Sequence, residues 1–342
     1  MSDTVTAREG APPPEAQIAQ ILLSQLVPRL VYLFATLQLA DHLSAGPKTA
    51  EDLASLTGAH APTLSRILRT LASLGFVTED SQHRFALLPL GAVLKSGTPS
   101  HAAALILGGE VCTRSLDHFL YSVQTGKTGF ERSFGKPAFD WLGEHPTEAS
   151  LFNHTMVGFH GMEPAAVAAV YDFSKMKTVA DVGGSTGNMI ATILTKYPEP
   201  RGILFDLPHV VAEAPAFLEQ RGVADRVRIE GGSFFDGVPA GADAYVLSHV
   251  IHDWNEEQCL TILGHCRRAM GAHGRLLLVE MVLPEGDAPH PGKLLDLLML
   301  SVPGGEERTP SQYKVLLDKA GFTMTQVVPT QSLVSIVEAV PK

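Results

Sequence analysis

Apolar side chains recur at helical spacing through the first part of the chain. Between residues 15 and 43 they stand three or four positions apart, which predicts one or two amphipathic helices. Pro28 is expected to kink or split this segment, because proline has no backbone N–H and clashes inside a helix. Thr49 and Asp52 form a capping-box pattern that predicts the start of another helix, and Gly58 is expected to end it.

The next segment predicts a winged-helix motif. A leucine-rich helix ends at Gly75, and residues 76–91, FVTEDSQHRFALLPLG, have the pattern of two short strands around a polar turn. Such motifs often bind DNA through the second helix, and Arg66 and Arg69 lie on its polar face. The alternative is a solvated helix face in a domain used for dimerisation.

The pattern changes after about residue 172. Residues 101–171 predict several short helices with breaks near Gly126, Gly135 and Pro146, whereas later residues alternate between short apolar runs and helical segments. Such alternation is typical of an α/β fold with a doubly wound parallel sheet, here with antiparallel strands at its end. The predicted division is a disordered tail over 1–14, a winged-helix domain over 15–100, a helical connector over 101–172 and an α/β domain over 173–342.

Composition narrows the classes of partner. The 342 residues carry a net charge of -10, so a protein that binds by neutralising phosphates is disfavoured and a small-molecule partner is expected rather than nucleic acid. The cysteines Cys112, Cys259 and Cys266 have no zinc-type spacing, which suits a reducing cytoplasm. No apolar run is expected to span a bilayer, so no membrane partner is predicted.

The stretch DVGGSTGN, residues 181–188, predicts a glycine-rich turn between a strand and a helix. Such a turn can be plain punctuation, but Asp206 closes the next apolar run, where a carboxylate can accept ribose hydroxyls. The pair indicates an adenosine-type ligand, either NAD or S-adenosylmethionine. Asp181 would repel a pyrophosphate, which favours S-adenosylmethionine.

The stretch SHVIHDWNEEQC, residues 248–259, places two histidines after an apolar run. A zinc site would need a third protein ligand, and no HExxH or cysteine cluster supplies one, so no metal is predicted. His252 stands at the carboxyl end of a predicted strand, where open α/β sheets bind ligands, and an imidazole suits proton transfer near neutral pH. His249 is interpreted as structural or pocket-lining.

Together with PGGEERTPSQYKVLLDKAGF, these two stretches resemble the plant and microbial S-adenosylmethionine-dependent O-methyltransferases that act on small hydroxylated molecules, such as the caffeic acid and hydroxyindole enzymes. The resemblance spans nearly the whole chain. It implies a Rossmann-like, seven-stranded methyltransferase-type sheet, an N-terminal winged-helix dimerisation domain and a homodimer. It also implies that S-adenosyl-L-methionine is the cofactor and S-adenosyl-L-homocysteine the product.

The resemblance assigns roles residue by residue. It makes His252 the general base and places a glutamate on either side of it, Glu280 and Glu307. Its cofactor positions are Gly183, Asp206, Ser233 and Phe234. The stretch LFNHTMVGFHGM lies where the family has a substrate-wall segment, which places Met156 and His160 at the acceptor; the alternative is a helix whose apolar side chains face the core. Asp253 is expected to fix the loop or to contact the acceptor. The chain departs from many relatives at Ser185 and Ser233, where they have glycine and aspartate, and from many plant members at Ser248 and His249, where they have lysine and tryptophan.

The predicted activity is methylation of a phenolic or enolic hydroxyl of a small aromatic or polyketide-like metabolite in the cytoplasm. Three alternatives stand beside it. The scaffold could methylate nitrogen or perform a diverged reaction, or the chain could be a ligand-sensing regulator that uses the winged helix on DNA. Methylation of nucleic acid is disfavoured, because the chain lacks an Asn/Asp-Pro-Pro-Tyr/Phe motif.

Overall fold

The computed structural model describes residues 12–342. The chain divides into two compact units, of which the first holds the residues up to Thr113 and His145–Gly158. The second holds Arg114–Glu144 and Phe159–Lys342. Most of the predicted tail, residues 1–11, lies outside the described residues, and the other predicted domain boundaries stay predictions.

The first helical segment breaks at a different residue from the one expected. It forms three helices, α1 (Pro14–Ser24), α2 (Leu26–Thr36) and α3 (Leu39–Ser44). The chain breaks at Gln25, and Pro28 lies in the first turn of α2. Proline is tolerated there because the N–H groups of the first turn have no partner within the helix.

The same segment corrects the expectation that no apolar run is long enough to span a bilayer. Within the described residues, Pro14–Thr36 is long and apolar enough, by length and composition alone, to cross a membrane. Only Glu15 and Arg29 are charged in this stretch, so its average hydropathy is high although polar residues interrupt it. Five apolar side chains of the stretch are more than half exposed: Ile18, Ile21, Leu22, Leu23 and Leu26.

The capping box and the winged-helix motif are confirmed. Thr49 and Asp52 exchange two hydrogen bonds of 3.1 Å at the start of α4 (Ala50–Thr57). Helix α5 (Ala61–Ser73) buries its leucine-rich face. Strands β1 (Val77–Glu79) and β2 (Phe85–Leu87) then pair antiparallel as the wing.

A run of short helices follows. Their bounds are α6 (Pro89–Ala92), α7 (Pro99–Gly108), α8 (Glu110–Asp117), α9 (Phe119–Thr125), α10 (Gly129–Phe134), α11 (Ala138–Glu144), α12 (Pro146–His160) and α13 (Glu163–Val170). Gly126 and Gly135 end α9 and α10 in the left-handed conformation, which glycine adopts without steric cost. Pro146 is the first residue of α12, so all three predicted breaks are confirmed.

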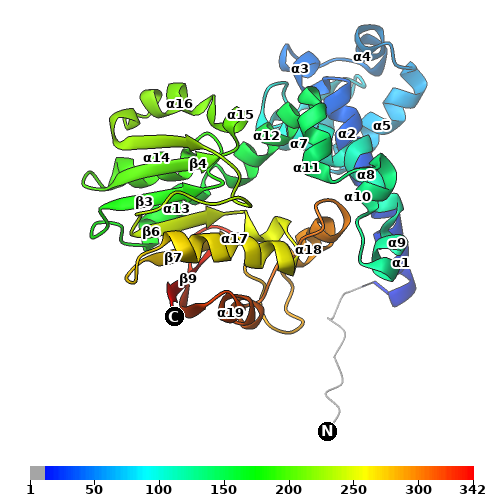
Figure 1. Ribbon diagram of the computed structural model, residues 1–342. Helices are drawn as coiled ribbons and strands as arrows, with labels where there is room; N and C mark the ends of the chain where they lie inside the picture. The colour runs from blue at the N-terminus through cyan, green and yellow to red at the C-terminus, as the bar shows by residue number, and fades with distance from the viewer. Residues whose placement is uncertain (1–11) are drawn as a thin grey trace. The chain divides into compact units, whose positions relative to one another are not determined.

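The second unit is built on a mixed sheet of seven strands within residues 12–342 (Figure 1). Its order is β5-β4-β3-β6-β7-β9-β8, and the strands from β5 to β7 are parallel, whereas β9 runs antiparallel to both β7 and β8. The bounds are β3 (Thr178–Val182), β4 (Arg201–Asp206), β5 (Val227–Gly231), β6 (Ala244–Ser248), β7 (Arg275–Glu280), β8 (Phe322–Pro329) and β9 (Ser335–Pro341). The predicted Rossmann-like, seven-stranded fold is therefore confirmed.

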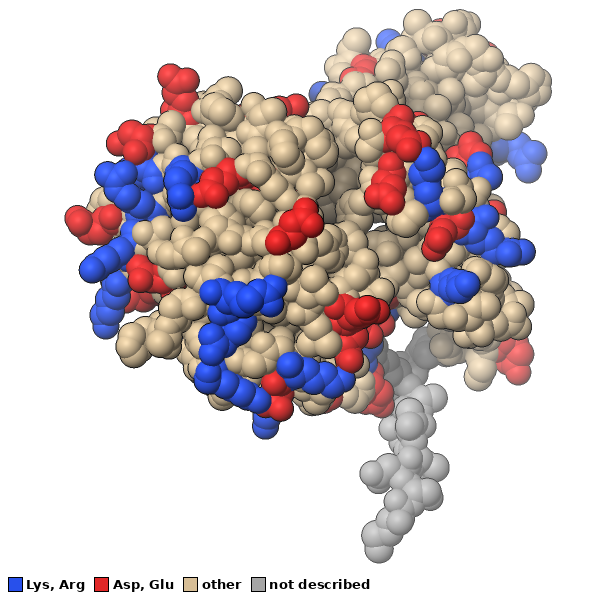
Figure 2. All heavy atoms as spheres, in the orientation of Figure 1, with Lys and Arg blue, Asp and Glu red and all other residues tan. Residues whose placement is uncertain are grey.

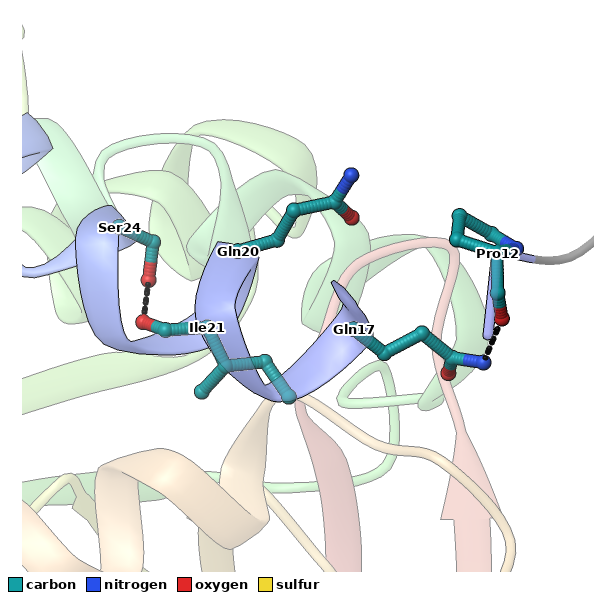
Figure 3. A pocket seen from close by; sticks show the side chains of 5 residues that line it. All are labelled: Pro12, Gln17, Gln20, Ile21 and Ser24. Carbon is teal, nitrogen blue, oxygen red and sulfur yellow. Dashed lines mark hydrogen bonds between the residues drawn. The ribbon is translucent and has the colours of Figure 1, made fainter. Parts of the chain in front are cut away.

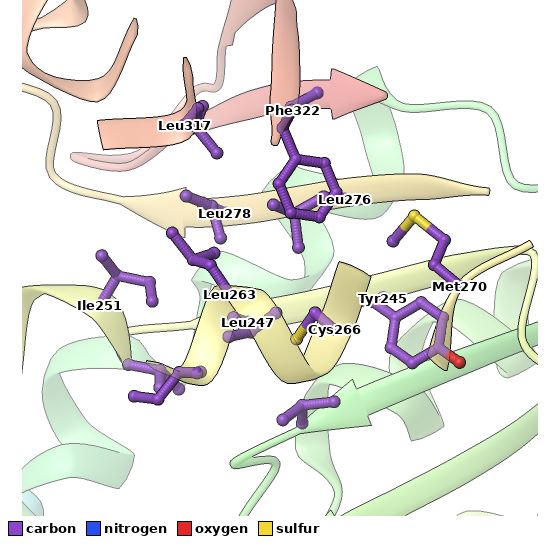
Figure 4. Packing of buried hydrophobic residues seen from close by; sticks show 14 of the residues in the cluster. Tyr245, Leu247, Ile251, Leu263, Cys266, Met270, Leu276, Leu278, Leu317 and Phe322 are labelled. Atoms are coloured by element: carbon purple, nitrogen blue, oxygen red, sulfur yellow. The ribbon is translucent and has the colours of Figure 1, made fainter. Parts of the chain in front are cut away.

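Helices connect the strands and cover the sheet. They are α14 (Asn188–Lys196), α15 (Pro208–Val211), α16 (Ala214–Gln220), α17 (Glu256–Ala269), α18 (Gly292–Ser301) and α19 (Pro310–Lys319). Figure 4 shows one side of the core, where Leu263 and Cys266 of α17 pack against side chains of β6 and β7. This packing fixes the loop between β6 and α17, which carries the two histidines of the 248–259 stretch.

Charged side chains of both signs are interspersed on the face shown in Figure 2. The chain has 36 acidic and 26 basic residues, and acidic and basic side chains lie among one another on this face. Phosphate backbones attract proteins through clustered Lys and Arg. The charge pattern on this face thus agrees with the expected small-molecule partner. That the protein binds no nucleic acid stays a prediction.

Candidate active site

Four neighbouring strands bring polar residues to one edge of the sheet. Strands β4, β3, β6 and β7 are adjacent and parallel, so their carboxyl ends meet. Asp206, Ser248 and Glu280 are the last residues of β4, β6 and β7, and Asp181 precedes the last residue of β3. Ligands of open α/β sheets bind beyond such ends, where the strand order reverses.

The turn after β3 exposes its backbone to a ligand. Gly183 has a φ of +72°, and a Cβ at this position would lie 2.8 Å from a methyl group of Val250. Gly187 has a φ of +93° and caps the start of α14. Side chains are therefore excluded from both positions, and a ligand can approach the main chain closely.

Two carboxyl groups flank this turn. Asp206 accepts hydrogen bonds from the backbone N–H groups of Ser185 (2.8 Å) and Leu207 (2.7 Å), while burial raises the pKa of its carboxyl. Asp181 accepts a bond from Ile190 N–H at 3.1 Å, and burial raises its pKa to about 7. The other Asp181 oxygen is buried without a hydrogen-bond partner among the described residues.

Ser233 and Phe234 follow β5 on a short turn. The Ser233 hydroxyl oxygen accepts a hydrogen bond from Phe235 N–H at 3.2 Å, so it stabilises its own turn. The Phe234 ring lies beside the glycine-rich turn, since a Cβ at Gly183 would stand 3.7 Å from it. The bare turn, the Asp206 carboxylate and this ring fit an adenosine-type cofactor.

His252 is held by carboxylates on both sides of its ring. It lies in a short 3₁₀ turn, Ile251–Asp253, and is only 6% exposed. Its Nδ1 stands 2.7 Å from Glu307 Oε1 and 3.8 Å from Glu280 Oε2. Its Nε2 is 3.6 Å from Asp253 Oδ1, beyond a good hydrogen-bond length. One ring nitrogen is thus anchored by a short contact, whereas the other has no contact of that length among the described residues.

Hydrogen bonds also hold the two glutamates, Glu280 through its side chain and Glu307 through its backbone. Glu280 Oε1 accepts hydrogen bonds from the N–H groups of Val250 (3.2 Å) and Ile251 (2.9 Å). The Glu307 backbone N–H donates to Asp296 Oδ1 at 2.8 Å. The catalytic residues implied by the resemblance, His252, Glu280 and Glu307, therefore form one buried cluster.

The electrostatics of the cluster stabilise a protonated imidazole. Burial by itself lowers the pKa of His252, but Glu280, Asp253 and Glu307 outweigh burial and raise it above its ordinary value. Burial has the opposite effect on a carboxyl group and raises the pKa of Glu280. The charge of His252 offsets this rise only in part. The site thus favours the state in which the histidine carries an additional proton.

Sequence reasoning missed two residues that hold this loop in place. The guanidinium of Arg308, only 2% exposed, donates to the backbone oxygens of Ile251 (3.2 Å) and Glu306 (3.1 Å). A Cβ at Gly305 would collide with the backbone oxygen of His252. Both residues belong to the GGEERT segment, but an arginine or glycine in a polar stretch has no local pattern that predicts burial.

The predicted acceptor residues fall in both units. His160 and Asp253 belong to the second unit, and Asp253 is next to His252. Met156 belongs to the first unit, in α12, so its role at the acceptor stays a prediction.

Sequence spacing offered no third ligand for His249 and His252, but folding gathers two groups of three such residues: His249 and His252 with Glu280, and His249 with His160 and Glu163. Folding brings Glu163 beside His160 and His249, with Glu163 Oε2 3.0 Å and 2.6 Å from their ring nitrogens. Sequence spacing gave no sign of this, because Glu163 and His249 are 86 positions apart. The three residues are joined by hydrogen bonds, and no relative indicates a metal.

Comparison with known proteins identifies the family. Residues 117–323 match the O-methyltransferase domain family, and residues 20–96 match the O-methyltransferase dimerisation domain. The chain is 45% identical to "Phenazine O-methyltransferase PhzM" of Lysobacter antibioticus, over 99% of both chains. The second match favours dimerisation over DNA binding for the winged helix.

Solved structures agree with these matches. The structure of "the Mitomycin 7-O-methyltransferase MmcR" is 35% identical and has a TM-score of 0.90, covering 96% of this chain and 98% of that one. The neocarzinostatin O-methyltransferase NcsB1 in complex with S-adenosylmethionine and 2-hydroxy-5-methyl naphthoic acid is 32% identical with a TM-score of 0.80, covering 92% and 96%. The chain therefore belongs to the S-adenosylmethionine-dependent O-methyltransferases that have an N-terminal dimerisation domain.

Proposed function

We propose that this enzyme methylates a phenolic or enolic hydroxyl of a small aromatic or polyketide-like metabolite, with His252 as general base. The observation that carries the proposal is the 2.7 Å contact between His252 Nδ1 and Glu307. An ionised carboxylate only accepts hydrogen bonds, so Nδ1 bears the proton in this pair and Nε2 of the neutral ring is free to take another.

When bound, S-adenosylmethionine supplies an electrophilic methyl group on a positively charged sulfur. The protein then has to align the acceptor oxygen and remove its proton. His252 Nε2 would take that proton, and the methyl group would pass from sulfur to the acceptor oxygen as the sulfur–carbon bond breaks, with S-adenosyl-L-homocysteine as the leaving group. Glu280 and Glu307 stabilise the resulting imidazolium, and Asp253 orients the acceptor or its loop.

The cofactor is proposed to lie along the glycine-rich turn. Gly183 would let it approach the backbone, Asp206 would accept its ribose hydroxyls, and Ser233 and Phe234 would lie beside its adenine. Ser233 brings no charge, and its hydroxyl already accepts a hydrogen bond from Phe235 N–H. We therefore expect weaker cofactor binding than with an aspartate at this position.

The aromatic acceptor class is inferred from the relatives and from the predicted acceptor residues. The names of the relatives describe a phenazine and a mitomycin enzyme, and the NcsB1 complex holds a naphthoic acid. We propose that His160 and Asp253, both in the second unit, contact such an acceptor in this protein. We also propose that the enzyme is cytoplasmic.

We further propose that the protein is a homodimer. The apolar side chains on α1 are exposed in the single chain, and a shallow pocket there is lined by Pro12, Gln17, Gln20, Ile21 and Ser24 (Figure 3). The pocket contains none of the predicted site residues. Exposed apolar surface of this kind is typical of an interface, and it falls partly within the dimerisation-domain match.

The proposed function is tested by a screen of aromatic acceptors with S-adenosylmethionine, read by the mass gain of one methylene. Phenols and enolised polyketides are expected to gain this mass at oxygen, which NMR of the product can locate. Methylation of matched anilines in place of the phenols would contradict O-methylation. Failure of every phenol and enol would contradict the proposed acceptor class.

A further inference from the structure

A second buried cluster of titratable groups lies beside the proposed base. It consists of His160 at the end of α12, Glu163 at the start of α13 and His249, which directly follows β6. The imidazole rings of His160 and His249 stack with 3.6 Å between centroids, and the His249 ring is 5.1 Å from that of His252. Removal of a proton by His252 does not use this cluster.

The hydrogen bonds of the cluster fix the tautomer of His249. Burial raises the pKa of Glu163, but hydrogen bonds from His160 and His249 outweigh it and lower the pKa to about 2, so the carboxylate is ionised and accepts only. Burial lowers the pKa of His249 to about 4, so its ring is neutral at pH 7. Its single N–H is therefore on Nε2, facing Glu163, and Nδ1 has a free lone pair.

That lone pair is buried and has no hydrogen-bond partner among the described residues. Leaving a buried polar atom without a partner costs about 1–3 kcal/mol. The His249 backbone is also left-handed, with a φ of +53°, which costs roughly 1–2 kcal/mol for a residue other than glycine. If the His249 imidazole served only for packing, nothing would offset the free-energy costs of the unpartnered nitrogen and of the left-handed backbone.

We propose that His249 positions the acceptor, and that its Nδ1 accepts a hydrogen bond from a second hydroxyl or N–H adjacent to the hydroxyl that is methylated. The ring centroids of His249 and His252 are 5.1 Å apart, so an aromatic acceptor that reaches His252 Nε2 through one hydroxyl can reach the His249 ring through a neighbouring group. Glu163 acts through His249 by holding its tautomer. The inference rests on the proposed function. It adds a preference for methyl acceptors that carry a second hydroxyl or N–H beside the methylated hydroxyl.

Matched acceptor pairs test the proposal: catechol against phenol, and 2,3-dihydroxynaphthalene against 2-naphthol. After correction for the two equivalent hydroxyls, the wild-type enzyme is expected to prefer the diol by roughly threefold to tenfold in kcat/KM, the value of one net hydrogen bond. In His249→Phe the ratio should fall towards one, mainly through a higher KM for the diol. His249→Asn, which keeps an acceptor oxygen and tolerates the left-handed backbone, should restore part of the preference.

Thermal unfolding and cofactor binding show whether each variant is folded. Should His249→Phe fail to fold, Glu163→Gln carries the same test, because it leaves His249 in place and removes the ionised partner that fixes its tautomer. A diol-to-monohydroxyl ratio of kcat/KM that is the same in the wild-type enzyme and in these variants would overturn the inference. It would leave the proposed O-methylation intact. Failure of the wild-type enzyme on all four compounds would overturn the proposed acceptor class and the inference together.

Discussion

Each histidine of the site is fixed through one ring nitrogen, which leaves the other nitrogen available. His252 is anchored to Glu307 through Nδ1, and His249 to Glu163 through Nε2. The carboxylates around His252 raise its pKa, whereas burial lowers that of His249. Two imidazoles three positions apart therefore differ in proton affinity: His252 holds a proton that it has taken more tightly, whereas His249 stays neutral and can accept a hydrogen bond.

The first prediction at this scale concerns pH. A general base works unprotonated, so kcat/KM should rise with pH through a pKa above the ordinary histidine value of about 6.5. Glu307→Gln removes a negative charge that stabilises the imidazolium, so the acid limb of the profile should move to lower pH. Glu257→Gln, at an exposed position on α17, should leave the profile unchanged. A limb that stays in place in Glu307→Gln would contradict the anchoring role.

The second prediction concerns Ser185, one of the serines that depart from the pattern of many relatives. Ser185 has a φ of +54°, a conformation that glycine adopts without the clash of a Cβ. Ser185→Gly should raise the free energy of unfolding by roughly 0.5–1 kcal/mol, the strain relieved minus the extra chain entropy of glycine. Ser185→Ala keeps the Cβ and should unfold like the wild type in chemical denaturation. An equal gain in both variants would show that backbone strain is not the cause.

At the scale of elements, the site depends on two loops that touch through their backbones. The loop after β6 carries His252 and ends where Asn255 caps α17, and the loop before α19 carries Glu307. Arg308 donates hydrogen bonds across this contact. Gly305 permits it, since only a residue without a side chain fits against the His252 backbone.

Gly305→Ala should therefore separate the two loops and lengthen the contact between His252 and Glu307. We expect a fall in kcat of roughly 100-fold, the order of loss that misplacing a reacting group by about 1 Å produces. Gly271→Ala is the matched control, because a Cβ at this position meets nothing within 4 Å. Full activity in Gly305→Ala would contradict the requirement for a close backbone contact.

The elements could largely be predicted, because periodicity and caps are local signals. The Thr49–Asp52 box, the glycine stops and the alternation of strands and helices all depend on neighbouring residues. The contact of Glu163 with His249 and the burial of Arg308 could not be predicted, since they arise only when distant segments pack. His252 could be singled out as a candidate base from its position at the end of a strand. Glu280 and Glu307 could be assigned to it only through the resemblance to the family.

At the scale of the whole molecule, the exposed apolar face of α1 implies a partner surface. Ile21 and Leu22 are 64% and 61% exposed in the single chain. We expect Ile21→Glu with Leu22→Glu to weaken the proposed homodimer more than roughly 100-fold in Kd, because burying an unpaired carboxylate costs several kcal/mol. Sedimentation velocity over a concentration series measures the shift.

Val315→Glu, at an exposed apolar position on α19, is the control and should leave the sedimentation of the enzyme unchanged. A wild-type protein that sediments as a monomer at all concentrations would contradict the homodimer. So would a double variant that dimerises as well as the wild type.

The most direct test of the central claim is single-turnover methyl transfer by His252→Gln, with cofactor binding measured on the same preparation. The rate should fall by roughly 10²–10⁴-fold, the usual contribution of a general base, while cofactor affinity stays within about twofold. His273→Gln, at an exposed position, should transfer methyl groups like the wild type. An undiminished rate in His252→Gln would contradict the assignment of His252 as the base.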